Sequence, residues 1–136
     1  MFELLDHPAD IGFRAHGRTL EELFANSALA MLSIAGEPEK AQPAIEYPLS
    51  AGGADRESLL VNWLNEVLYW FDGKQVAFRE IRVTHLDEER VRATGMGEPR
   101  DPGRHRSKLI VKAATYHQLK IARDGGGWLA EVFLDI

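Results

Sequence analysis

The groups in this sequence whose types and spacing could do chemistry are carboxylates near its two ends. Asp6, His7 and Asp10 fall within five residues ahead of the first apolar alternation, and the sequence closes on Asp135 and Ile136. Aspartates in a short turn readily bond nearby amides, so Asp6 and Asp10 also have a structural interpretation as turn formers or caps. A main-chain carboxylate on Ile136, beside Asp135, would place two hard oxygen donors one residue apart.

These carboxylates form a set only if the two ends of the chain meet. If the last strand pairs with the first, Asp10 joins Asp135 and Ile136, and an all-oxygen set completed by water suits calcium or magnesium. Zinc is disfavoured, since the sequence has no clear cluster of nitrogen or sulfur ligands. The alternative is that Ile136 packs in the core while Asp135 and the terminal carboxylate are solvated. The residues alone leave both interpretations open.

Three histidines are candidates for catalysis or metal binding. His105 in a loop and His117 on the apolar face of a predicted strand could act as general acid and base, and His7 could be a metal ligand. A histidine on the inner face of a strand is more often a core residue. The sequence has no Gly-x-Ser-x-Gly, phosphate-loop or His-Glu-x-x-His motif. A metal-dependent hydrolase or phosphotransferase using His105 and His117 therefore stays an alternative function.

A local basic patch interrupts an otherwise acidic sequence. It consists of Arg100, Arg104, His105, Arg106 and Lys108. The patch is a candidate docking face for an acidic partner or a phosphate, and the simpler interpretation is a solvated loop.

Length and composition limit the class of protein. The chain has 136 residues, a formal charge of −5 and no cysteine. We expect one domain over residues 1–136, without disulfides or a cysteine nucleophile. The acidic balance disfavours tight nucleic-acid binding by phosphate neutralisation. No stretch approaches the roughly 18 consecutive apolar residues of a membrane span, and no signal peptide precedes the first strand, so we expect a cytoplasmic protein without a membrane partner.

Two helices are predicted to carry the core. Thr19 and Glu22 form a capping box in which Glu22 returns to the Thr19 amide, and the helix that follows ends at Gly36. Residues 58–72 are apolar on most sides, so this second helix must be covered on more than one face. Its cap is Asp55 or Ser58, and Gly73 is the expected left-handed residue after its end.

The remaining segments are predicted to be strands and turns. They comprise strand 11–17, edge strand 45–49 with Pro48, hairpin 78–86 and 91–96, loop 97–105, long strand 109–121, turn 124–127 and strand 128–136. The expected fold is therefore α+β, with two amphipathic helices packed on a mostly antiparallel sheet in a single domain.

Five ordered segments resemble the archease family. They are DHPADIGFRAHGRTLEELF at 6–24, LLVNWLNEVLY at 59–69, GEPRDP at 97–102 with His105, VKAATYHQL at 111–119, and the ending Asp135 and Ile136. The resemblance covers nearly the whole chain in order. One departure is Pro8, where members often carry threonine, which removes a hydroxyl near the expected metal loop.

The resemblance implies a function that the residues alone do not. Archeases are non-enzymatic partners of a GTP-dependent RNA ligase that acts in tRNA splicing and RNA repair, and they promote guanylylation of the ligase's active-site histidine and repeated turnover. It implies a divalent metal, calcium first and magnesium or manganese as alternatives, on Asp10, Asp135 and Ile136. Contact with tRNA would be indirect, through the ligase. Asp6, His7, His105, Lys108 and His117 are candidates for partner docking or for supporting the metal ligands. A general chaperone is a further alternative.

Overall fold

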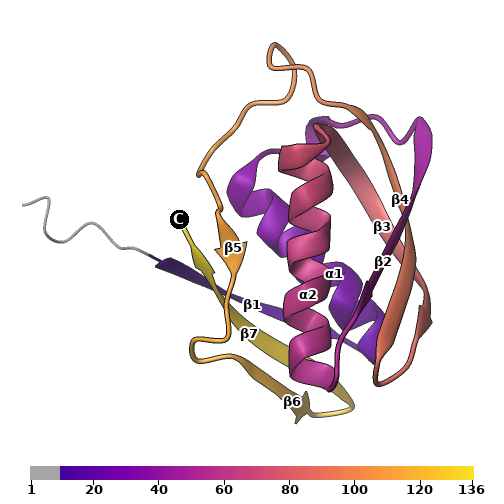
Figure 1. Ribbon diagram of the computed structural model, residues 1–136, viewed down its shortest axis with the longest axis vertical. Helices are drawn as coiled ribbons and strands as arrows, with labels where there is room; N and C mark the ends of the chain where they lie inside the picture. Colours follow the sequence, from indigo (N-terminus) through magenta and orange to yellow (C-terminus); the bar gives the residue numbers. More distant parts are fainter. Residues whose placement is uncertain (1–9) are drawn as a thin grey trace, which may run out of the picture.

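The computed structural model describes residues 10–136 as two antiparallel sheets and two long helices (Figure 1). The elements are β1 Asp10–Gly17, α1 Leu20–Ala35, the 3-10 turn η2 Pro38–Lys40, β2 Ile45–Gly52, α2 Arg56–Leu68, the π-helical turn η3 Tyr69–Gly73, β3 Val76–Leu86, β4 Arg90–Pro99, β5 Ala113–Ala114, β6 Lys120–Asp124 and β7 Gly127–Asp135. The predicted α+β class is confirmed, with the strands divided between two sheets instead of one. No helix within residues 10–136 combines the length and apolar character needed to cross a membrane.

Helix α1 starts and stops where local chemistry requires. The Thr19 hydroxyl accepts a hydrogen bond from the Glu22 amide at 3.1 Å, as predicted. The Glu22 carboxylate, however, accepts from the Arg18 amide at 2.9 Å and not from that of Thr19. It also pairs with the Arg18 guanidinium, so one carboxylate fixes the chain just ahead of the helix. Gly36 ends α1 by donating to the Leu32 carbonyl at 2.8 Å.

Helix α2 is the centre of the core, as its all-round apolar sequence predicts. Both candidate caps act together, because the Asp55 carboxylate accepts from the Ser58 amide and the Ser58 hydroxyl accepts from the Asp55 amide. Trp63 is fully buried, and its indole N–H donates to the Phe24 carbonyl of α1 at 2.9 Å. Contacts with α1, β2 and β5 cover the helix on several sides.

The end of α2 differs from the prediction. Gly73 is not the left-handed residue; the chain widens into η3, and Gln75 takes the positive φ of 58°. Gly73 instead leaves room for a neighbouring side chain. A Cβ at this position would lie 2.9 Å from the ring of Tyr69, so any other residue would require that ring to move away from the turn.

The two sheets lie on either side of the helices. The order β2-β4-β3 places β2 at an edge, which confirms the prediction from Pro48, and β3 with β4 forms the predicted hairpin. In the other sheet, β7 pairs with β1 on one side and with β5 and β6 on the other. The β6–β7 hairpin turns through Gly125 at φ +61°. Figure 1 shows α2 in front of α1, with β2, β3 and β4 to one side of both helices.

The segment between β4 and β6 was predicted incorrectly at both ends. β4 continues to Pro99, so the expected loop at 97–105 begins only at Arg100. The expected long strand at 109–121 is interrupted, leaving the two-residue β5 and the separate β6. Gln118 adopts a φ of 51° in the turn between them, which no continuous strand allows.

Candidate functional site

The first and last strands bring two predicted metal-ligating residues face to face. β1 and β7 pair antiparallel along their whole length, in a register that places Asp10 directly opposite Asp135. This pairing fulfils the condition on which the predicted oxygen site depended. Alternation then places Gly12, Arg14 and His16 on the same outer face of the sheet as Asp10.

The backbone hydrogen bonds show which type of strand pair Asp10 and Asp135 form. The carbonyls of Phe133 and Asp135 accept from the amides of Thr115 (3.1 Å) and Lys112 (2.8 Å), on the β5 side of β7. Their backbone polar groups therefore point away from β1, which makes Asp10 and Asp135 a non-hydrogen-bonded pair. In such a pair the Cα atoms are about 4.5 Å apart and the side chains are at their closest.

Electrostatics at this position favour a cation. Like charges directly opposite each other on neighbouring strands repel. Within residues 10–136, neither Asp10 nor Asp135 forms an ion pair with a basic side chain. Two carboxylates in this arrangement supply hard oxygen donors of the kind that bind Ca²⁺ or Mg²⁺.

The third predicted ligand, Ile136, follows directly after β7. Its side chain is partly buried and packs against the core, as one of the two sequence-based interpretations required. That packing fixes the residue beside Asp135. In the described part of the chain, no group of three or more His, Cys, Asp or Glu side chains is arranged to hold a metal ion. The predicted set contains two such side chains and one main-chain carboxylate.

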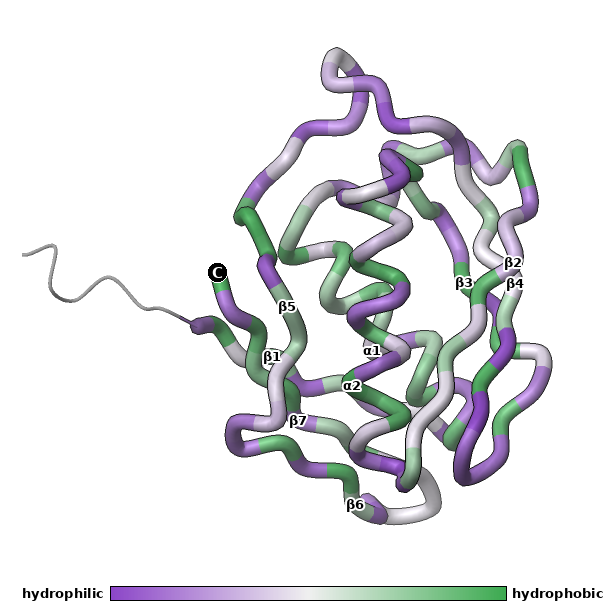
Figure 2. The backbone as a smooth tube through the Cα atoms, in the orientation of Figure 1, coloured by the Kyte–Doolittle hydropathy of each residue, from purple (hydrophilic) through white to green (hydrophobic). Residues whose placement is uncertain are grey.

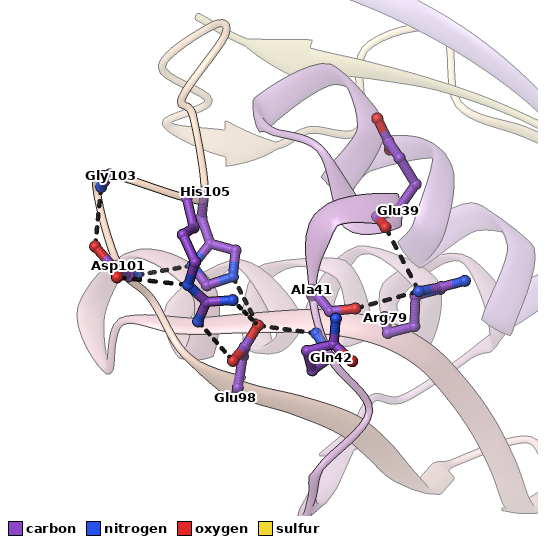
Figure 3. A network of polar contacts seen from close by, with 9 residues as sticks. Glu39, Ala41, Gln42, Arg79, Glu98, Asp101, Gly103 and His105 are labelled. Atoms are coloured by element: carbon purple, nitrogen blue, oxygen red, sulfur yellow. Dashed lines mark hydrogen bonds and ion pairs between the residues drawn. The ribbon is translucent and has the colours of Figure 1, made fainter.

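His105 lies in a polar network at the end of β4 (Figure 3). It is 6 % exposed. Its Nδ1 accepts from the Asp101 amide at 2.7 Å, so Nε2 carries the proton and donates to Glu98 at 2.9 Å. Glu98 also accepts from Arg104 and from the Gln42 amide. Both ring nitrogens of His105 thus hold the loop in place.

The predicted basic patch is largely used for internal contacts. Arg100 donates to the Phe71 carbonyl at 3.1 Å and to Ser107, and its guanidinium lies over the Phe71 ring. Lys108 donates through Nζ to the Ser33 carbonyl at 2.8 Å and through its amide to a second carbonyl at the end of α1. A lysine near a helix C-terminus complements the helix dipole. These cations fasten the loop to the helices.

His117 does not lie on an inner strand face as predicted. It is exposed in the turn between β5 and β6, where its ring packs edge-on against Phe133 with centroids 5.7 Å apart. His105 therefore contacts β4 of one sheet, whereas His117 contacts β7 of the other. Asp6, His7 and Pro8 lie outside the described residues.

The sequence pattern did not single out Asn65 or Glu98. The Asn65 side chain bonds both main-chain groups of Ala114, accepting at 2.8 Å and donating at 3.3 Å, and so ties β5 to α2. An asparagine on the narrow polar stripe of a mostly apolar helix is a signal that could have found it, because an amide at the border of a buried face needs partners. Glu98 carries no comparable signal, since its partners come from separate parts of the chain.

Taken together, the fold and this site define a small α+β protein whose first and last strands pair and oppose two carboxylates. The sequence model of the archease protein family matches residues 2–136. The chain belongs to the archease family.

Relatives and solved structures agree with this assignment. The archease of Methanosarcina mazei is 40 % identical over 139 residues, covering 99 % of this chain and 95 % of that protein. That of Sulfurisphaera tokodaii is 35 % identical, with 99 % and 98 % covered. The solution structure of Methanobacterium thermoautotrophicum protein 1598 superposes with a TM-score of 0.77 at 34 % identity, covering 95 % and 94 % of the chains. A Thermotoga maritima archease, described as a possible chaperone, shares the fold with a TM-score of 0.67 at 21 % identity, covering 100 % and 98 %.

Proposed function

We propose that this archease is a non-enzymatic activator of a GTP-dependent RNA ligase. The ligase joins 2′,3′-cyclic-phosphate or 3′-phosphate ends to 5′-hydroxyl ends in tRNA splicing and RNA repair. The archease promotes guanylylation of the ligase's active-site histidine and permits repeated turnover. Its tRNA contact is indirect, and its setting is the cytoplasm. The observation that carries the proposal is the opposition of Asp10 and Asp135 across β1 and β7.

The proposed means of action is a divalent cation on Asp10, Asp135 and the main-chain carboxylate of Ile136. Calcium is the preferred ion, with magnesium and manganese as alternatives, because all three donors are hard oxygens. Once bound, the ion supplies a positive charge and a Lewis acid at the protein surface. The chain's own part is positional. Pairing of β1 with β7, together with the Lys112 bond to Asp135, holds the donors in a fixed arrangement at the end of the sheet.

The contacts of the histidines favour the accessory role over the hydrolase alternative. A general acid and base pair must converge on one substrate. His105 is buried with both ring nitrogens bonded to Asp101 and Glu98, and His117 is exposed against Phe133. The charge network around His105 supports a structural role for that residue.

The Asp10→Asn variant tests the proposal. The substitution keeps the shape of the side chain and removes one carboxylate, so affinity for Ca²⁺ should fall by more than about tenfold. Asp124→Asn is the matched control, because Asp124 is an exposed aspartate at the far end of β6. Calorimetric Ca²⁺ titration and the rate of ligase guanylylation from GTP are measured for both variants.

The expected result is loss of stimulation in Asp10→Asn and normal stimulation in Asp124→Asn. Full stimulation by Asp10→Asn would remove the cation from the mechanism. Turnover of cyclic-phosphate RNA by the isolated protein would favour the hydrolase. Protection of unrelated clients from aggregation, equal in wild type and Asp10→Asn, would favour the general chaperone suggested by the description of the Thermotoga relative.

A further inference from the structure

Large apolar side chains are exposed around β5, at the edge of the sheet that holds the proposed cation site. Five large hydrophobic residues are exposed in the described part of the chain. Four of them, Tyr69, Leu109, Ile110 and Tyr116, belong to segments next to β5, and Ile110 is 75 % exposed. Exposed apolar patches on a small protein commonly mark interaction sites.

A groove separates Tyr69 from β5. It has a volume of about 360 Å³ and runs between the π-helical turn and β5, with Tyr69, Asp72, Lys112 and Ala113 among its lining residues. Ile110 is only two residues ahead of Lys112, which places their Cα atoms at most about 7 Å apart. Figure 2 shows a hydrophobic stretch of chain just before β5, close to the C-terminus.

The backbone that presents Leu109 and Ile110 is fixed at several points. Before the pair, the Lys108 amide donates to Ala35, and the Leu109 amide donates to Ile34 at 3.3 Å. After the pair, the Lys112 amide bonds Asp135. An apolar side chain held on an ordered backbone loses less conformational freedom when a partner covers it. The exposed pair is therefore prearranged for contact.

The charges around the pair indicate the kind of partner. Arg106 and Lys112 are exposed on either side of Leu109 and Ile110 in the sequence. An aliphatic anchor flanked by cations is complementary to an apolar pocket with acidic groups at its rim. The Lys112–Asp135 bond makes this surface continuous with the proposed cation site.

We propose that Leu109 and Ile110 form the surface that docks an acidic-rimmed apolar pocket of the RNA ligase. This inference rests on the proposed function and adds the contact that brings the cation site to the ligase. Docking and stimulation are then separate properties of one edge of the protein: Ile110 determines affinity, and Asp10 determines the effect once bound.

The test compares two isoleucines of the full chain. Ile110→Ser removes the proposed anchor, and Ile45→Ser is the matched control, because Ile45 is 44 % exposed on the edge strand β2 of the other sheet. Affinity for the purified ligase is measured by biolayer interferometry, and guanylylation is followed as a function of archease concentration. Thermal unfolding verifies that both variants are folded.

Ile110→Ser should weaken ligase binding by about tenfold, the loss typical of an interface hot spot, and should leave the rate at saturation unchanged. Ile45→Ser should match the wild type. Equal binding by Ile110→Ser and wild type overturns the docking surface and leaves the proposed function standing. A wild type that neither binds nor stimulates the ligase overturns both. Loss of binding to single-stranded RNA with unchanged ligase binding overturns the docking surface in favour of an RNA contact.

Discussion

At the scale of single residues, Glu98 shows how one carboxylate can hold a loop. Hydrogen bonds from Arg104, from the Gln42 amide and from His105 lower the pKa of Glu98 from 4.5 to about 2. The same pairing raises the pKa of Arg104. The network joins the chain ahead of β2 to the end of β4 and to the loop beyond it.

Glu98 should make stability depend on pH in the acid range. Its folded-state pKa is depressed, so its contribution is fully present above pH 4.5 and is lost as pH falls from 4.5 toward 2. Glu98→Gln should lower the unfolding midpoint at pH 7 and flatten its decline between pH 4.5 and 2. Urea unfolding at several pH values measures this, with Glu80→Gln, an exposed residue of β3, as control. An unchanged pH profile in Glu98→Gln would show that other carboxylates dominate acid unfolding.

The sequence predicted the roles of some individual residues better than those of others. Asp10 and Asp135 were singled out as oxygen donors near the two ends of the chain, and the structure supplies the β1–β7 register that places them opposite each other. His105 was considered as a catalyst because the sequence does not show that Glu98 and the Asp101 amide bond both of its ring nitrogens. Continuous alternation over residues 109–121 predicted that His117 lies on an inner face. This prediction was wrong because the turn at Gln118, with its positive φ, breaks the alternation.

At the scale of elements, β5 is held on one side by β7 and on the other by a single side chain of α2. Asn65 satisfies the amide and carbonyl of the buried Ala114, which face away from β7. Without Asn65 the two-residue strand has only its pairing with β7 and contacts with neighbouring side chains.

Asn65→Ala should therefore destabilise the protein by about 2 kcal/mol, because it leaves a buried donor and acceptor unpaired. Asn62→Ala is the control, since Asn62 bonds one exposed carbonyl, that of Gly52. Urea unfolding gives the free energy, and hydrogen exchange should show lost protection at the Ala114 amide. Protection at Ala114 equal to that of the wild type would indicate that β7 alone holds β5.

Local signals predicted some elements well and others poorly. The caps at Thr19 and Asp55 and the turn at Gly125 depend on residues a few positions apart, so the sequence contains the information. The region 100–119 depends on contacts with distant partners, such as Lys108 with Ser33 and Ala114 with Asn65. Its apolar alternation resembled a strand, and these contacts decide where pairing stops.

At the scale of the whole molecule, a bound cation should stabilise the fold. Ca²⁺ at 100 times its Kd would add about 2.7 kcal/mol, which raises Tm by roughly 10 °C for a chain of this size. Calorimetry with Ca²⁺ and with EDTA measures the difference. Asp135→Asn should abolish the shift and Asp124→Asn should retain it. A full shift in Asp135→Asn would place the cation elsewhere on the protein.

The α+β class followed from the sequence, but the division into two sheets did not. The apolar alternation of a strand shows which of its faces is buried, but it does not show which sheet the strand joins. The hairpins β3–β4 and β6–β7 were predicted because their strands are neighbours in sequence. The β1–β7 pairing entered only as a condition of the cation site.

The β1–β7 pairing also has a kinetic consequence. Ile11 and Leu134 are partners although nearly the entire described chain separates them. Contacts of such long sequence separation form slowly, because the entropy of closing the intervening chain is lost before the contacts contribute any stabilising free energy. The β3–β4 hairpin closes locally, so refolding should build its sheet first and join the two ends last. A cation that needs both Asp10 and Asp135 would then bind only when folding is complete, and its main effect on the rates would be to slow unfolding.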